Sequence, residues 1–194
     1  MLGKDSRFMW CVMHVEDGKE PRAERFIEGL LGDRSGGCFH LTRFRRKKYG
    51  GKWRTVQEPL LPGYVFIATE DAEQLYRELE SVSGYELLGS SAEYVSRLED
   101  GEADFIERIA GKGSRAGEIA LSLIKVEEDG EITVLSGPLL SVEGQVRKID
   151  FHKRVAEVET KLFGEKKVMY LGVEFEDVVC DTDKTGAKSE AKRS

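Results

Sequence analysis

The stretch LLPGYVFI at residues 60–67 predicts a β-strand. Its last four residues, from Tyr64 to Ile67, are aromatic or β-branched, which favours a strand. The run is rich enough in apolar residues to predict a strand at the centre of a sheet. Pro62 stands near the start of the run, where a missing backbone N–H is tolerated.

The residues before this strand predict another strand and a helix. Residues 8–15 are apolar, aromatic and β-branched, and the acidic residues 16–18 end the run. Apolar residues then recur at the spacing of one helix face. Pro21 suits the first turn of this helix and Gly32 suits its end.

The residues between and after these elements complete a mixed domain. The further elements expected up to residue 110 are a hairpin at 43–57, helices at 71–81 and 103–109, and a short strand at 85–88. Gly50 and Gly51 form the tight turn of the hairpin. The sequence therefore predicts an α+β fold, in which helices flank an N-terminal antiparallel sheet.

A change of composition follows residue 110 and predicts a second domain. Residues 110–117 are small, polar and rich in glycine, which is typical of a linker. Short β-like stretches at 132–135, 144–150, 156–162 and 168–173 then predict a small β-barrel. We expect an N-terminal domain at 1–110, a linker at 111–125, a second domain at 126–179 and a disordered tail at 180–194.

Composition and charge exclude several classes of protein. The chain has 194 residues, 34% of them charged, and a net charge of -6, so it is not a uniformly basic nucleic-acid binder. No apolar run reaches the roughly 20 residues of a membrane span, and the N-terminus lacks a signal-peptide core. The three cysteines are widely spaced and predict no disulfide framework. We expect a cytoplasmic protein with no membrane contact.

Three stretches, taken in order, resemble the NusG family of transcription elongation factors over about residues 8–179. They are WCVM at 10–13, LLPGYVF at 60–66, and a pattern of glycines and β-branched residues at 130–149 that is similar to a KOW domain. The resemblance implies that the barrel is an SH3-like KOW domain. A finer resemblance, to the LoaP branch of antiterminator paralogs, lies in KIDFHKRVA at 148–156 and EIALS at 118–122. The later loop reads Leu162-Phe163-Gly164-Glu165, where the family commonly has Arg in the last position.

The apolar strand at 60–67 is a candidate binding surface as well as a candidate core. Strand side chains alternate between two faces, so some of them can form an exposed apolar pocket. The family resemblance implies that this surface receives the clamp helices of the RNA polymerase largest subunit. The candidate residues for this contact are Trp10, Leu61, Tyr64, Phe66, Leu87 and Leu88. The alternative is that these side chains only fill the core of the sheet.

Residues 43–54 form the most basic run of the chain. Seven of its twelve residues are Arg or Lys, and three aromatic residues interleave with them. Such a pattern attracts phosphates and can stack on bases. The candidate nucleic-acid-binding residues are Arg43, Arg45, Arg46, Lys47 and Lys48. The family resemblance implies that they lie beside upstream or non-template DNA. The alternative is an ordinary solvated hairpin.

A second basic group lies in the predicted KOW domain. Its candidate nucleic-acid-binding residues are Arg147, Lys148, His152, Lys153, Arg154, Lys166 and Lys167. A basic turn on a small barrel can hold the phosphates of a shaped RNA such as a hairpin. An ordinary solvated β-turn is the alternative.

No pattern in the chain predicts an enzyme. The sequence has no Walker loop, no GxSxG, no dinucleotide fingerprint and no metal-ligand pair of histidines, so we expect no catalytic residue, no metal and no cofactor. The resemblance implies a monomeric elongation and antitermination factor. Its N-terminal domain would bind bacterial RNA polymerase and its KOW domain a nascent leader RNA hairpin. The alternatives are a general NusG-type factor without hairpin specificity and a ribosome-associated RNA-binding KOW protein.

Overall fold

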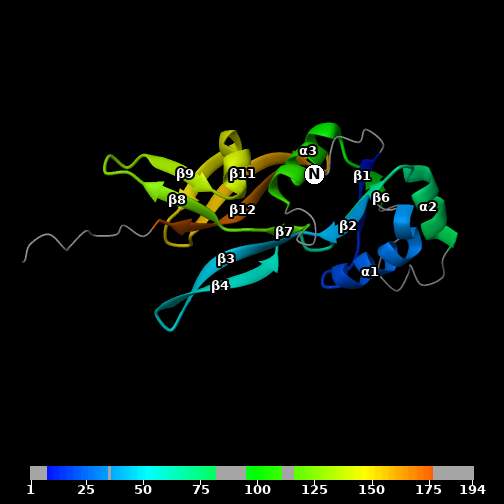
Figure 1. Ribbon diagram of the computed structural model, residues 1–194, viewed down its shortest axis with the longest axis horizontal. Helices are drawn as coiled ribbons and strands as arrows, with labels where there is room; N and C mark the ends of the chain where they lie inside the picture. Colours follow the sequence, from blue (N-terminus) through cyan, green and yellow to red (C-terminus); the bar gives the residue numbers. More distant parts are fainter. Residues whose placement is uncertain (1–7, 35, 82–94, 111–115, 177–194) are drawn as a thin grey trace, which may run out of the picture.

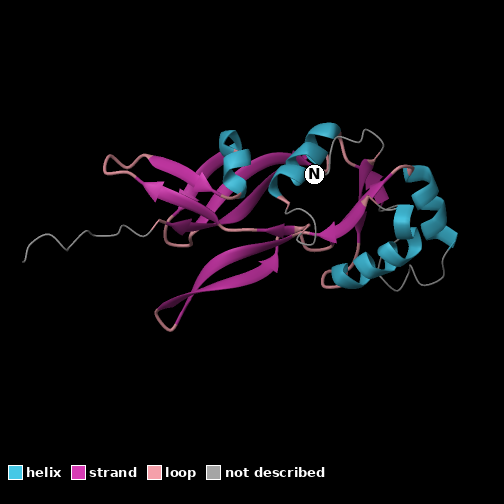
Figure 2. Cartoon of the chain, viewed as in Figure 1, coloured by secondary structure: helices cyan, strands magenta, loops and turns pink. Residues whose placement is uncertain are grey.

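The computed structural model describes residues 8–34, 36–81, 95–110 and 116–176, and shows a mixed α and β protein with few helices (Figures 1 and 2). Helices α1 and α2 lie together at one end of the molecule, and most of the strands lie toward the other (Figure 2). The predicted strand at 85–88, with Leu87 and Leu88, falls outside the described residues.

The N-terminal sheet is antiparallel, as predicted. Its strands in spatial order are β2 (Gly37–His40), β5 (Tyr64–Thr69), β1 (Met9–His14) and β6 (Val95–Arg97). The stretch that begins at residue 60 therefore supplies β5, an inner strand. Its alternate side chains enter two different cores: Val65 and Ile67 join one buried cluster, and Phe66 and Ala68 join the other.

Three helices cover this sheet. They are α1 (Glu20–Leu31), α2 (Ala72–Ser81) and α3 (Asp100–Ile109), and a short 3-10 turn, η1 (Gly32–Arg34), follows α1. Helix α1 has a proline in its first turn and Gly32 as its C-cap, which confirms the signals in the sequence. Helices α1 and α2 pack on the face of Val65 and Ile67, whereas α3 packs on the opposite face.

The basic hairpin consists of β3 (Thr42–Tyr49) and β4 (Lys52–Pro59). Both turn glycines have a positive φ, 53° at Gly50 and 81° at Gly51, a conformation that glycine adopts at little cost. The short strand β7 (Glu118–Ile119) pairs in parallel with the start of β3. The hairpin projects from the rest of the chain (Figure 1).

A five-stranded sheet forms the C-terminal half and is compatible with a KOW half-barrel. Its strands in spatial order are β10 (Val146–Asp150), β11 (Val155–Leu162), β12 (Glu165–Phe175), β8 (Ser122–Val126) and β9 (Ile132–Ser136). Two short 3-10 helices, η5 (Pro138–Ser141) and η6 (Glu143–Gln145), interrupt it. The sequence predicted no helical turn here. Strand β7 and most of β8 lie within residues 111–125, where the sequence predicts a linker.

The two halves of the chain share one buried core. A single apolar cluster contains Trp10 and Phe66 from the N-terminal sheet together with Leu162 and Leu171 from the C-terminal sheet. The hairpin also crosses the C-terminal sheet closely, because a Cβ at Gly172 would collide with the carbonyl oxygen of Phe44. The candidate binding surfaces therefore lie where the two halves of the chain meet.

Candidate binding surfaces at the junction of the two halves

The tip of the β11–β12 turn presses against the N-terminal sheet and forms what we call the aromatic junction: Tyr64, Phe66 and Phe163. The ring of Phe163 stacks on Tyr64 with centroids 4.5 Å apart and an interplanar angle of 18°, and it lies 6.4 Å from the ring of Phe66. Phe163 has a φ of 59°, which is strained for a residue with a side chain. The packing of its ring between the two halves compensates for that strain.

Polar contacts surround the aromatic junction. Glu102 of α3 is buried, and its carboxylate accepts hydrogen bonds from the backbone N–H of Gly164 at 2.9 Å and of Glu99 at 3.1 Å. The first of these bonds joins the N-terminal half to the tip of the turn. Lys161 adds an ion pair to Glu99 at 2.9 Å, exposed to solvent. The tip is therefore held by one buried carboxylate and one stacked ring.

The structure brings together some of the predicted polymerase-binding residues and buries others. Phe66 is fully buried and Trp10 is only 8% exposed, with its indole N–H donating to Glu107 at 2.7 Å. Leu61 and Tyr64 are partly buried and pack against the shared core. Of the described candidates, these two are the ones at the surface, and Phe163 lies over Tyr64.

The base of the hairpin is a closed ion cluster. Glu58 receives Arg43 and Arg45 at 2.9 Å each and Lys47 at 2.6 Å. Burial alone would raise the pKa of Glu58, but the hydrogen bonds from Lys47, Arg45 and Arg43 outweigh it and hold the pKa at about 2. Three of the five residues of the hairpin that were predicted to bind nucleic acid thus form ion pairs with one carboxylate.

Sequence reasoning missed Glu58, although the sequence contains a signal for it. A two-residue turn at Gly50 and Gly51 fixes the register of the hairpin, which places Arg43 directly opposite Glu58. Side chains of directly opposed residues share one face of the sheet. Counting outward from the turn would therefore have paired this acid with the basic run.

The far end of the hairpin keeps exposed cations. Lys48, Lys52 and Arg54 are exposed, and none of them forms an ion pair with a carboxylate of the described residues. Arg46 instead turns toward the C-terminal sheet and pairs with Glu174 at 2.8 Å. Among the described residues, the exposed cations of the hairpin that have no carboxylate partner therefore lie near its tip.

Some basic residues of the C-terminal sheet are likewise paired with carboxylates, and others are exposed. Arg147 and Lys166 share Glu159, at 2.5 and 2.7 Å, and their hydrogen bonds lower the pKa of that carboxyl. Lys167 pairs with Glu165 at 3.4 Å. Lys148 is exposed on β10.

The turn between β10 and β11 carries the remaining predicted residues. Asp150 accepts a hydrogen bond from the backbone N–H of Lys153 at 2.9 Å, and this bond is the main cause of the lowered pKa of Asp150. His152 and Lys153 are exposed, whereas Arg154 turns inward and pairs with Glu174 at 2.6 Å. The turn thus presents an imidazole and an ammonium group to solvent on a fixed backbone, with the ammonium 3.7 Å from the carboxylate of Asp150.

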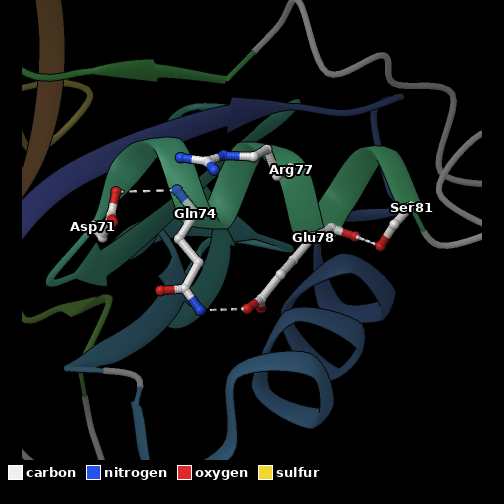
Figure 3. A pocket seen from close by; sticks show the side chains of 5 residues that line it. All are labelled: Asp71, Gln74, Arg77, Glu78 and Ser81. Carbon is white, nitrogen blue, oxygen red and sulfur yellow. Dashed lines mark hydrogen bonds between the residues drawn. The ribbon is translucent and has the colours of Figure 1, made fainter.

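Other groups of side chains in the described part of the chain include a pocket along α2 and a buried thiol. Within the described residues no cluster of three His, Cys, Asp or Glu side chains could hold a metal. A shallow pocket along α2 is lined by residues whose contacts are mostly within that helix, as in the bonds of Gln74 to Glu78 and Ser81 to Glu78 (Figure 3). Burial raises the pKa of the Cys11 thiol to about 11, which leaves it protonated and unreactive. No described helix is long and apolar enough to cross a membrane.

Comparison with known proteins shows similarity to two transcription termination/antitermination proteins. No family model matches the chain. The chain is 27% identical over 165 residues to the transcription termination/antitermination protein NusG of Pseudomonas aeruginosa, covering 80% of this chain and 89% of that protein. It is 25% identical over 173 residues to NusG of Treponema pallidum, covering 80% and 90%. The chain is similar to both NusG proteins along most of its length.

A solved structure is similar as well. It is described as "Domain interaction in Thermotoga maritima NusG", and it is 18% identical to the NusG-like chain, covering 86% of this chain and 94% of the other, with a TM-score of 0.42. The names of the two sequence relatives denote transcription factors and no enzyme.

Proposed function

We propose that this NusG-like protein is a transcription elongation and antitermination factor. It acts as a monomer in the bacterial cytoplasm and needs neither cofactor nor catalytic residue. The observation that carries the proposal is the similarity to two NusG transcription termination/antitermination proteins over 80% of the chain. The finer proposal is LoaP-type: the N-terminal half binds RNA polymerase, the KOW half binds a nascent leader RNA hairpin, and pausing and termination are suppressed.

Leu61 and Tyr64 are the residues we propose for contact with the polymerase clamp helices. They are the described apolar candidates at the surface, and a pair of helices packs well on such a patch. Phe163 covers Tyr64 in this structure, so the polymerase must displace the turn tip before it can use this surface. The strain at Phe163, on the order of 1 kcal/mol, makes that displacement easier.

The exposed cations at the turn of residues 150–154 support an RNA contact by the KOW half. His152 and Lys153 stand on a turn that Asp150 holds in shape, so they lose little freedom when they meet phosphates. Binding of the nascent RNA raises the local concentration of the N-terminal half at the polymerase. The tip of the hairpin, with Lys48, is our proposed contact to upstream or non-template DNA.

The experiment is single-round transcription through a terminator, with purified RNA polymerase and templates that carry or lack the native leader. We expect readthrough only when the leader is present. Readthrough or changed pausing without the leader would instead identify a general NusG-type factor. No effect and no polymerase binding would overturn the proposal and favour a ribosome-associated RNA-binding protein.

Two variants locate the polymerase surface. Tyr64→Asp places a charge in the apolar patch and should weaken polymerase binding by about a hundredfold, as loss of an interface anchor does. Phe163→Asn removes the competing ring while Asn tolerates the positive φ, so polymerase affinity should rise. Tyr170→Asp, on the exposed surface of β12, is the matched control and should leave binding unchanged.

A further inference from the structure

Phe151 is an exposed aromatic residue at the tip of the β10–β11 turn. It is 46% exposed, although it lies among polar turn residues. One side of its ring stacks on Phe175 at the end of β12, with centroids 5.6 Å apart and an interplanar angle of 22°. The ring is therefore fixed by a neighbour and still open to solvent.

Arg154 links Phe175 to the hairpin through cation–π contacts. The guanidinium of Arg154 lies 5.1 Å from the centroid of Phe175 and 4.4 Å from that of Trp53 on β4. Glu174 holds this guanidinium from the side with a hydrogen bond of 2.6 Å. We call Phe151, Phe175, Arg154 and Trp53 the aromatic ladder. It combines parts of the hairpin and of the C-terminal sheet, and Phe151 is its outer end.

The charges around the outer end of the ladder favour an anionic ligand. His152 and Lys153 follow Phe151 directly and are exposed. The nearby carboxylate of Asp150 accepts a hydrogen bond from the backbone N–H of Lys153 at 2.9 Å, and the Lys153 ammonium lies 3.7 Å from it in an exposed ion pair. A flat apolar ring followed by an imidazole and an ammonium group matches a nucleotide, whose base is planar and whose phosphates are negative.

Tyr170 is a second exposed aromatic residue of the same sheet, and its charged surroundings differ from those of Phe151. Tyr170 is 42% exposed on β12, but it stands opposite Glu157 on β11. A carboxylate there would repel a phosphate backbone. The guanidinium of Arg43 contacts the carbonyl oxygen of Tyr170 but is paired with Glu58 at 2.9 Å, whereas Lys153, close to Phe151, is exposed to solvent.

We propose that the open face of Phe151 stacks on an unpaired base of the RNA, while Lys153 and His152 contact the flanking phosphates. This inference rests on the proposed RNA binding by the KOW half and names the structural class of the ligand: a loop or bulge of a hairpin, since a base within a duplex has no free face. The ladder keeps the ring in place before the RNA arrives, so little ordering is required on binding.

The test uses the full-length protein and a pool of RNA stem-loops with randomised loops, from which the wild-type protein selects its binders. Phe151→Ala should bind the selected RNAs about ten- to a hundredfold more weakly, which is the contribution of one stacked base. Phe151→Tyr, which keeps a ring, should restore the affinity. Tyr170→Ala is the matched control and should bind like the wild type.

A second readout reports stacking directly. When 2-aminopurine replaces single loop adenines of the selected RNA, its fluorescence should fall on binding at one position in the wild type and stay high with Phe151→Ala. Unchanged affinity and quenching in Phe151→Ala would overturn this inference and leave RNA binding intact. Equal losses in Phe151→Ala and Tyr170→Ala would also overturn it, and selection of no RNA by the wild type would remove the proposed function together with it.

Discussion

Strand β11 ends in two turns of similar construction: the inner turn, between β11 and β12, and the outer turn, between β10 and β11. They differ in what their side chains contact. Each contains a residue other than glycine with a positive φ, Phe163 at one end and Arg154 at the other. Each has an aromatic ring at its tip and a carboxylate that accepts a backbone N–H. At the inner turn the ring and the carboxylate are packed against the N-terminal half, whereas at the outer turn Phe151 faces solvent.

The geometry of each turn places an aromatic ring at its tip, but the surroundings of the turn determine whether that ring is packed or exposed. The inner turn joins the halves of the chain because Tyr64 and Glu102 of the other half meet it. The outer turn is supported from behind by Trp53 and so leaves its tip open. The inner turn should therefore contribute to stability and the outer turn to binding.

The largest expected effect is the loss of folding stability when Glu58, in the hairpin that supports the outer turn, is protonated at low pH. The pKa of Glu58 is lowered from 4.5 to about 2 in the folded state, so its ion cluster stabilises the fold above about pH 4.5 and loses that contribution as pH falls toward 2. The loss is about 2–3 kcal/mol. Urea unfolding across this pH range should show it in the wild type and much less in Glu58→Gln. The same pH dependence in both proteins would contradict the prediction.

The two carboxylates of the turns offer a matched pair of substitutions. Glu102→Gln replaces one acceptor oxygen of a buried carboxylate, which accepts two part-buried backbone N–H groups, by a donor and should reduce the free energy of unfolding by about 2 kcal/mol. Asp150→Asn at the exposed turn should cost less than about 0.5 kcal/mol. Urea denaturation at neutral pH measures both. Equal values would show that the inner turn is not the tighter one.

The two aromatic tips should differ in the same direction. Phe163→Asn removes a partly buried stacked ring, at a cost of about 1–2 kcal/mol after relief of the backbone strain. Phe151→Ala should change the free energy of unfolding by less than about 0.5 kcal/mol, because its ring is half exposed. Thermal unfolding by circular dichroism compares them. A larger loss for Phe151→Ala would invert the assigned roles.

The smallest expected effect lies at the inner end of the aromatic ladder. Trp53→Leu removes the contact of the indole with Arg154, which contributes about 0.5–1 kcal/mol. Trp53→Phe keeps a ring in place and is the control. Both are measured by urea unfolding. A change in RNA affinity in Trp53→Leu without one in Trp53→Phe would show that support from the hairpin reaches the outer turn.

Much of the fold could be predicted from sequence because its signals are local. The apolar run from residue 60 forms the inner strand β5, Gly50 and Gly51 make the hairpin turn, and Gly32 ends α1. The candidate site was harder. The basic run at 43–54 predicts one continuous phosphate-binding surface, yet three of its cations meet Glu58. Short strands such as β7 have no signal of their own, because a distant partner determines them.

Local sequence is enough to predict strands β1 and β5, helix α1, the turn of the hairpin and the places where positive charge concentrates. Those properties depend on periodicity, turn chemistry and composition over a few neighbouring residues. Only the tertiary structure decided that Phe163 covers Tyr64, that Glu58 neutralises the base of the hairpin, and that Phe151 stays open. Exposure and pairing depend on contacts between residues far apart in the chain, and these follow from how the two halves pack.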